Sequence, residues 1–209
     1  MFQPSQFAEH RIEVMHDLIR NHALATLISS GQNGLTANHL PLVLHPGDGK
    51  HGLLRGHIAK VNPIWKDFDA SVERLVIFQG PQHYVSPSWY PSKQEQDKAV
   101  PTWNYAVVHA HASLTVTDDA DWLLKHVQTL TAQHEAGRKK PWAVDDAPQD
   151  YIDQLIKGII GLELHITRLY GTWKVSQNRS EQDRNGIVQG LIDEDTTVAT
   201  QMANLVSAS

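Results

Sequence analysis

The chain of 209 residues contains no cysteine. Without cysteine it has neither a disulfide framework nor a cysteine-ligated zinc site. This absence suits the reducing cytoplasm, which is the location we expect. The chain also lacks a run of about 18 apolar residues, the length that a membrane-spanning helix requires, and Met1 is not followed by the basic and apolar segments of a secretion signal. We therefore expect a protein that does not contact a membrane.

The chain also has fewer positively than negatively charged side chains. Lysine and arginine number 18 against 23 aspartates and glutamates, which gives a net charge of -5 at pH 7 and a pI of about 6.2. Proteins that bind nucleic acid gain much of their affinity from a basic face that displaces counterions from the phosphates. The overall charge does not support DNA binding, which leaves only a local patch as a route to it.

Several motifs of known chemistry are missing. The chain has no Gly-x-Gly-x-x-Gly after a strand, no phosphate loop ending in Gly-Lys-Ser/Thr, no His-Glu-x-x-His and no Gly-x-Ser-x-Gly elbow. The common dinucleotide-binding, nucleotide-triphosphate-binding, zinc-protease and esterase classes are therefore not indicated. His109 and His111 share one face of a predicted strand, but no third ligand follows at a clear spacing. We interpret them as part of a polar, partner-facing sheet surface and expect no metal.

The hydrophobic pattern that is present alternates between strand and helix. Apolar residues recur at helical spacing over residues 9–20, 119–135 and 148–160. Strands are predicted at residues 23–29, 35–44, 51–57, 75–79, 105–117 and 162–167. Strands joined by short turns, with helices at the start and in two late blocks, predict an α+β fold with a barrel or strongly curved sheet. We expect one domain over residues 1–190 and a partly disordered tail over residues 191–209, fraying from about Glu194.

One strand end gathers basic and amide side chains. In the segment LLRGHIAKVNPIW (residues 53–65), Arg55 and His57 alternate outward on the predicted strand, and Lys60 follows within one turn. Asn62 can cap a short helix after the strand. The segment is either a solvated basic turn or a seat for an anion. Three converging donors, at about 1.5–3 kcal/mol each, would hold a phosphate well.

The stretch SPSWYPSKQEQDKAVPTWNY (residues 86–105) has an unusual composition. Its three prolines resist both helix and strand, which predicts a long ordered loop, and four aromatic side chains flank its charged middle. The loop is either a lid over the core or a wall for a planar aromatic ligand, for which offset ring stacking adds about 0.5–1.5 kcal/mol. The residues alone leave these two interpretations equal.

A second polar cluster, KVSQNRS at residues 174–180, follows the last predicted strand, which we expect Gly171 to interrupt. Its amides, hydroxyls and two cations can bind carbonyls and ring nitrogens of a ligand, or they can cap the helix that follows. Both interpretations stay open on the residues alone.

Six segments carry a resemblance to a known family: GLTANHLPLVL, LRGHIAKVNPIWK, VIFQGPQHYVSPSWYPSK, VPTWNYAVVHAH, HEAGRKKPWAVDDAP and WKVSQNRS. In this order they resemble the PaiB-type FMN-binding negative transcriptional regulators, and the likeness covers about residues 1–190. The resemblance implies a split β-barrel related to the pyridoxamine-phosphate oxidase group, with FMN at the interface of a homodimer.

The resemblance also implies which residues surround the FMN. Those around the phosphate would be Arg55, His57, Lys60 and Asn62. Those at the isoalloxazine edge and beside the ring system would be Asn38, His39 and Gln79. The residues expected to line the flavin ring would be Trp103, Asn104 and Tyr105. The residues expected to complete the pocket, from the same or the partner subunit, would be Lys174, Ser176, Gln177 and Arg179.

The resemblance leaves more than one function open. The family name implies repression of transcription, although no predicted helix carries the basic and amide side chains of a major-groove recognition helix. The alternative is an FMN-dependent oxidoreductase that takes hydride from a reduced nicotinamide, in which the flavin carries the chemistry. A second alternative is haem or tetrapyrrole binding, because related split barrels bind such ligands and the chain has 13 histidines.

Overall fold

The structure of the chain is a computed structural model, which describes residues 1–32, 34–66, 71–92 and 99–209. Asn33, in a predicted turn, and residues 93–98, in the middle of the aromatic loop, lie outside the described residues.

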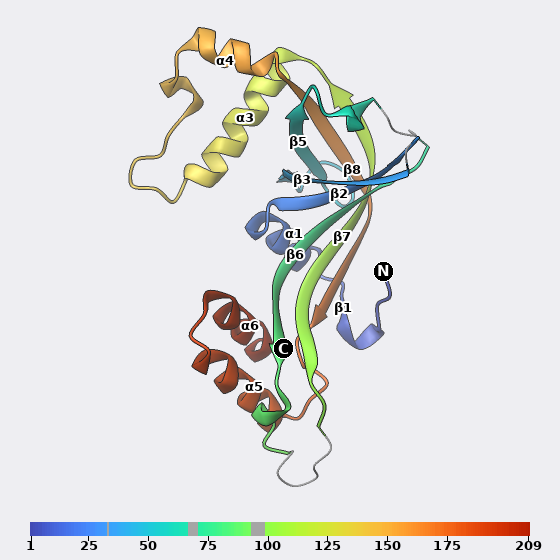
Figure 1. The fold of residues 1–209 in the computed structure, drawn as a ribbon, viewed down its shortest axis with the longest axis vertical. Coiled ribbons are helices and arrows are strands. Elements are labelled where there is room, and N and C mark those ends of the chain that lie inside the picture. The colour runs from blue at the N-terminus through green and yellow to red at the C-terminus, as the bar shows by residue number, and fades with distance from the viewer. Residues whose placement is uncertain (33, 67–70, 93–98) are drawn as a thin grey trace. The chain divides into compact units, whose positions relative to one another are not determined.

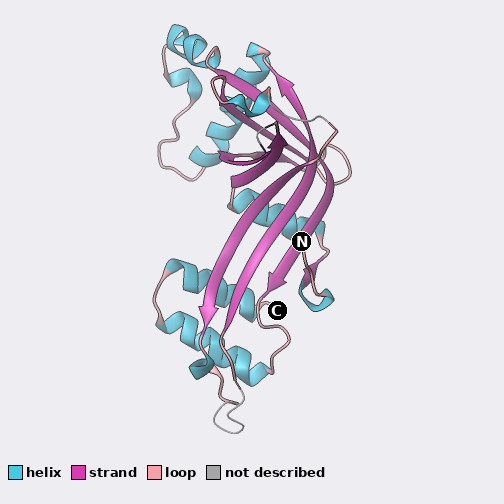
Figure 2. Ribbon diagram, turned by 45° about the vertical axis from the view of Figure 1, so that its right-hand side comes forward, coloured by secondary structure: helices cyan, strands magenta, loops and turns pink. Residues whose placement is uncertain are grey.

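The described chain contains runs of strands with α-helices near the start, before β8 and at the C-terminal end (Figures 1 and 2). The helices are α1 (Ile12–Asn21), α3 (Ala120–Glu135), α4 (Gln149–Ile156), α5 (Glu181–Asp193) and α6 (Thr197–Ser207), with short 3-10 turns η1 (Ser5–Phe7), η2 (Pro63–Trp65), η3 (Pro87–Trp89) and η4 (Val144–Asp146). The strands are β1 (Ala8–Glu9), β2 (Leu24–Gly31), β3 (Gly34–Pro41), β4 (Val43–His45), β5 (Leu53–Ala59), β6 (Arg74–Val85), β7 (Thr102–Thr117) and β8 (Ile159–Lys174). Among the described helices, none has the length and apolar character needed to cross a bilayer.

The strands form one sheet in the order β3-β2-β6-β7-β8-β5-β4, with β1 paired to β8. Strands β3 and β4 are separated only by Leu42, so one stretch of chain pairs with β2 through its first part and with β5 through its second. The two ends of the sheet order are therefore joined, which closes the sheet into a barrel. With helices beside the barrel, the predicted α+β split-barrel fold is confirmed.

Close contacts within the chain define two compact units. The barrel unit comprises residues 19–78 and 109–169, and the terminal unit comprises residues 1–18, 79–108 and 170–209. The single FMN-binding domain that the sequence predicts over residues 1–190 stays a prediction.

The barrel unit is filled by alternate residues of its strands. Leu27, Leu54 and Leu162 are fully buried, as the two-residue period of a half-buried strand requires. Gly56 leaves room for a neighbour, because a Cβ there would lie 2.6 Å from the Leu42 side chain. The inside of the barrel is thus mainly a packed apolar core, and Arg55 and His57 lie on the outer face of β5.

Helices α3 and α4 pack together beside the barrel (Figure 1). Asp119 caps α3 by accepting a hydrogen bond from the Trp122 amide at 2.8 Å, as the sequence predicts. The predicted helix after Pro148 ends earlier than its apolar stripe, because the chain turns at Gly158, whose amide donates to the Leu155 carbonyl. The rest of that stripe belongs to β8.

The terminal unit has its own apolar core, where α5 and α6 pack together. Gly171 does not interrupt β8, contrary to expectation. A Cβ at Gly171 would lie 2.8 Å from the Met15 side chain, so the glycine allows close packing within a continuous strand. The segment expected to fray from about Glu194 holds α6, whose buried Met202 and Val206 belong to the apolar core.

Gly186 should be the least replaceable glycine of α5. A Cβ there would stand 2.1 Å from the Trp89 carbonyl oxygen, which belongs to the backbone and cannot rotate away. Gly186→Ala is therefore expected to lower the free energy of unfolding by about 1–3 kcal/mol in urea denaturation, although alanine is normally the better helix former. Gly137→Ala, with no atom within 4 Å of its Cβ, is the control and should be neutral or slightly stabilising. A Gly186→Ala protein as stable as the parent would contradict this packing.

Candidate functional site

Arg55 lies on the outer face of β5, directly opposite Glu163 of β8. Its Nε donates a hydrogen bond to Glu163 Oε1 at 2.8 Å, and its guanidinium lies 5.8 Å from the centre of the Trp122 ring. The indole Nε1 of Trp122 donates to the same carboxylate oxygen at 3.3 Å. The first cation of the predicted phosphate seat is therefore held between a carboxylate and an indole.

His57, two residues further along β5, contacts a second histidine. Its Nδ1 lies 3.1 Å from Nε2 of His126 on α3, and the His126 ring stacks on Trp122 with 5.3 Å between centroids. Burial lowers the pKa of the His57 imidazole. Burial also lowers the pKa of His126, to about 4, and the nearby His57, His45 and Arg55 lower it further. Both rings are therefore neutral at pH 7.

The end of β5 has a different set of contacts. Lys60 Nζ forms an ion pair with Asp118 Oδ1 at 2.5 Å, and both side chains are substantially exposed. Asn62 caps η2 as predicted, because its Oδ1 accepts from the Ile64 amide at 3.1 Å. Its Nδ2 donates to Asn38 Oδ1 at 2.8 Å.

The four predicted phosphate ligands thus form two groups. The inner group is Arg55 and His57 with their partners Glu163, Trp122 and His126; the outer group is Lys60, Asn62 and Asn38 with Asp118. Four residues lie between the two cations, so their Cα atoms are at most about 16 Å apart, the length of five extended steps. The chemistry of the outer group fits a phosphate, since its lysine pair is exposed and its amides are neutral donors. The inner group, as arranged here, binds its own carboxylate.

The isoalloxazine-edge pair predicted on β3 is divided between two faces of its strand. Asn38 contacts Asn62, whereas the His39 Nδ1 lies 3.1 Å from the Thr26 hydroxyl of its cross-strand neighbour. Adjacent strand residues point to opposite faces, so one ligand surface does not meet both side chains.

In the terminal unit, several predicted ligand residues hold the backbone together. Asn104 and Ser176 are almost fully buried, and the Asn104 Nδ2 donates to the Ser176 hydroxyl at 2.9 Å. Ser176 has a positive φ of 64°, which this bond helps to hold. Gln177 accepts from the Val175 amide at 2.9 Å and donates to the Trp173 carbonyl at 2.6 Å. These three side chains shape the turn after β8.

The two predicted cations of this turn also have partners. Lys174 Nζ donates to the Thr102 hydroxyl at 2.6 Å. The Arg179 guanidinium lies 5.0 Å from the centre of the Tyr90 ring, a cation–π contact.

Trp103 is the predicted flavin-wall residue with an open ring. It is half exposed, and its centroid lies 6.0 Å from that of Tyr84 at an angle of 67°. The indole Nε1 donates to the Gln82 side chain. Trp103 lies on β7, which begins three residues before the predicted strand, so the aromatic loop is shorter than expected. Tyr105 is partly buried on the same strand, and Gln79 is exposed on β6.

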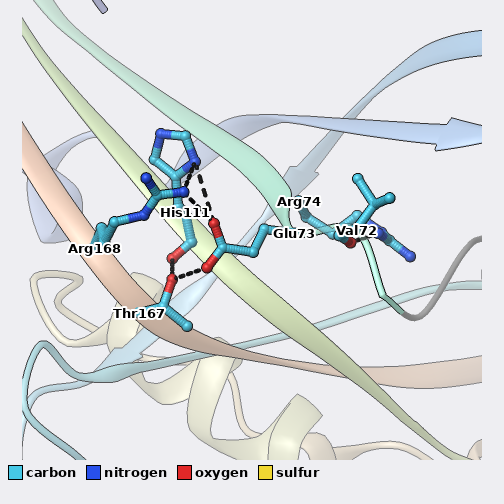
Figure 3. Close-up of polar contacts among 6 residues, drawn as sticks. All are labelled: Val72, Glu73, Arg74, His111, Thr167 and Arg168. Carbon is cyan, nitrogen blue, oxygen red and sulfur yellow. Dashed lines mark hydrogen bonds and ion pairs between the residues drawn. The ribbon is translucent and has the colours of Figure 1, made fainter.

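His111 belongs to a polar cluster on the barrel unit (Figure 3). Glu73 accepts a hydrogen bond from the Thr167 hydroxyl at 2.5 Å and pairs with Arg168, and its Oε2 lies 3.7 Å from His111 Nδ1. The Thr167 hydroxyl and the Arg168 guanidinium hold the pKa of Glu73 below its usual range. Among the described residues no group of three or more His, Asp or Glu side chains is arranged to hold a metal ion.

Sequence reasoning missed the carboxylates and aromatics that contact the predicted ligands. Glu163 meets Arg55 through the register of β5 with β8. Asp118 follows β7, which is separated from β5 by β8 in the sheet order, so its ion pair with Lys60 is not apparent from the sequence. A search for acidic residues opposite each predicted cation would have found Glu163 once the strand pairing was known.

Comparisons with known proteins agree with the fold and the resemblance. Residues 1–168 match a family model described as "Putative FMN-binding domain". The Bacillus subtilis protease synthase and sporulation protein PAI 2 is 31% identical, with 99% of this chain and 96% of that protein covered. An uncharacterized protein of Emericella nidulans is 34% identical at the same coverage of both chains.

Solved structures show the same fold at low sequence identity. The FAD and heme binding protein from Mycobacterium smegmatis has a TM-score of 0.59 and 15% identity, covering 84% of this chain and 78% of that one. The flavocytochrome Anf3 from Azotobacter vinelandii has a TM-score of 0.59 and 11% identity, covering 86% and 75%. These likenesses concern the fold alone, so the haem alternative stays a prediction.

The resemblance to PaiB-type proteins is confirmed by the PAI 2 relative, and FMN as the predicted cofactor is confirmed by the family match. The match covers β1 to most of β8, including the inner and outer groups of β5. The chain therefore belongs to this family of FMN-binding domains.

Proposed function

We propose that the chain binds FMN and that the outer group holds its phosphate. The observation that carries this proposal is the Lys60–Asp118 pair, whose side chains are 33% and 60% exposed. Exposed ion pairs contribute about 0–1 kcal/mol, so a doubly charged phosphate can replace Asp118 at little cost. The neutral amides of Asn62 and Asn38 lie beside each other and add donors that carry no competing charge.

The other contacts that the resemblance implies stay predictions within this proposal. Arg55 and His57 would reach the phosphate only after Arg55 leaves Glu163, which is less exposed than Asp118. Of the predicted wall residues, Trp103 has a half-exposed aromatic ring that could stack on a flavin, whereas Asn104 is buried. A homodimer with FMN at its interface, as the resemblance implies, is part of the proposal.

Bound FMN would supply hydride and single-electron transfer, which no side chain of this protein offers. The chain's own contribution is binding and orientation. Lys60 would fix the phosphate end of the cofactor.

The second candidate function is an FMN-dependent oxidoreductase. The described helices are not basic, which favours this function over direct binding of DNA. None of the described helices α1 and α3 to α6 carries more Lys and Arg than Asp and Glu. A recognition helix in the major groove needs the opposite balance. A regulatory role, if the chain has one, would then act through a protein partner or through the flavin.

A fluorescence titration of FMN into the purified protein tests the proposal. We expect saturable quenching with one FMN per chain; quenching that rises linearly without saturation would contradict FMN binding. Multiple turnovers of the bound flavin with reduced nicotinamide would then assign the oxidoreductase. A shift of promoter DNA at physiological salt, absent with scrambled DNA, would assign direct repression instead.

A further inference from the structure

A cavity of about 310 Å³ lies in the barrel unit between β5, α3 and α4. Its walls are apolar side chains, chiefly Val127, Trp142, Val144, Ile152, Leu155 and Ile156. The lining residues that carry a polar group are His57, Thr131 and Trp142, and none of the lining residues is charged. The volume is at the lower end of the range for small-molecule sites and suits a molecule of one or two rings.

The hydrogen bonding of His57 and His126 fixes which nitrogen of His57 carries a proton. The two rings share one hydrogen bond, between His126 Nε2 and His57 Nδ1. The remaining His126 nitrogen, Nδ1, is buried and has no hydrogen-bond partner among the described residues. Buried N–H groups without an acceptor are rare, so the proton of neutral His126 belongs on Nε2.

This tautomer leaves His57 with its own proton on Nε2. Nδ1 of His57 accepts from His126 and must be unprotonated, because the ring is neutral. Nε2 has no partner in the part of the chain that the structure describes, and it is not among the fully buried polar atoms. His57, which lines the cavity, therefore has an N–H at Nε2 that no described residue occupies.

We propose that this cavity binds an uncharged aromatic carbonyl compound, whose ring packs against Trp142 and the α4 side chains and whose oxygen accepts a hydrogen bond from His57 Nε2. Charged ligands are disfavoured, because the lining offers them no counter-charge. Apolar molecules without an acceptor would leave the His57 donor unpaired. Neither Lys60 nor Asn62 of the outer group lines this cavity, whereas His57, which does line it, is also one of the phosphate contacts that the resemblance implies.

Two probes of nearly equal shape test the proposal: 2-acetylnaphthalene, which has a carbonyl, and 2-ethylnaphthalene, which does not. In calorimetric titrations of the full chain we expect saturable 1:1 binding of the ketone, about tenfold tighter than that of the hydrocarbon. The proposal is overturned if the ketone does not bind saturably, or if the two probes bind equally.

Two variants locate the probe. His57→Phe should remove the tenfold preference for the ketone while the hydrocarbon still binds, and Leu155→Trp, at a half-exposed position of α4, should weaken both probes by filling the cavity. Unchanged ketone affinity in the Leu155→Trp protein would place the site elsewhere.

Nitrogen-15 NMR of the wild-type imidazoles gives an independent readout, for which we expect protonated Nε2 on both His57 and His126. Protonated Nδ1 on His57 would overturn the assigned donor.

Discussion

Replacing Lys60 with alanine is expected to weaken FMN binding about ten- to hundredfold. One charge-assisted hydrogen bond to a phosphate is worth about 1.5–3 kcal/mol, and each 1.4 kcal/mol is a factor of ten in affinity. Riboflavin, which has the same ring system but no phosphate, should bind the variant and the parent equally. Fluorescence titrations of both flavins into both proteins measure the difference.

Lys66→Ala is the matched control for Lys60→Ala. Lys66 is also an exposed lysine near the end of β5, but its Nζ lies over the Trp65 ring at 4.5 Å and outside the outer group. Its removal should change FMN affinity less than twofold. Arg55→Ala should reduce stability more than FMN affinity, because it leaves the Glu163 carboxylate without its cation. A large, FMN-selective loss in Arg55→Ala, with none in Lys60→Ala, would move the phosphate to the inner group.

Acid should destabilise the protein through His126. Its pKa is about 4 in the folded state, against an ordinary value of 6.5, because a ring that is 4% exposed loses its hydration when charged. Between these values the unfolded chain binds the proton and the folded chain does not, so stability falls as the pH drops. The contribution is complete above about pH 6.5, and its loss by pH 4 amounts to about 3 kcal/mol.

Urea denaturation at pH 7 and pH 4.5 measures this loss in the parent and in His126→Phe. The phenylalanine fills the same space without a titrating group, so the variant should lose distinctly less stability over that interval. His134→Phe, at an exposed position of the same helix, should retain the parent's full pH dependence. Identical pH dependence in the parent and the His126→Phe protein would show that the ring is not buried in its neutral form.

Local features of the fold could be predicted from the sequence. Asp119 and Asn62 have the side chains that cap helices, and each does so. The outward alternation of Arg55 and His57 follows from the strand period, and both lie on the outer face of β5. These signals act within a few residues, so no knowledge of the tertiary structure is needed to read them.

Features that depend on distant packing could not be predicted in this way. From the local sequence, Gly171 is predicted to interrupt the strand. In the structure it lies within β8, where its missing side chain leaves room for Met15, some 150 residues earlier in the chain. The helix α6 has apolar residues interspersed among small and polar ones, and its buried Met202 and Val206 pack in the core with α5. Tertiary contacts override local propensity at both positions.

The candidate site was predictable in residue type but not in grouping. Arg55 and Lys60 are both cations near one strand end, but the sequence does not reveal that one faces Glu163 under α3 and the other faces Asp118. Likewise, the amide and hydroxyl of Asn104 and Ser176 resemble ligand contacts until the structure pairs them with each other. Polar side chains satisfy one another when the fold brings them together, and this pairing depends on strand register.

The central claim is that the outer group of β5 holds the phosphate of FMN. A crystal structure of the protein grown with FMN in excess tests it most directly. We predict phosphate density within hydrogen-bond distance of Lys60 Nζ, with the Asp118 carboxylate displaced and the Arg55–Glu163 pair intact. An intact Lys60–Asp118 pair, with the phosphate bound elsewhere, would contradict the claim.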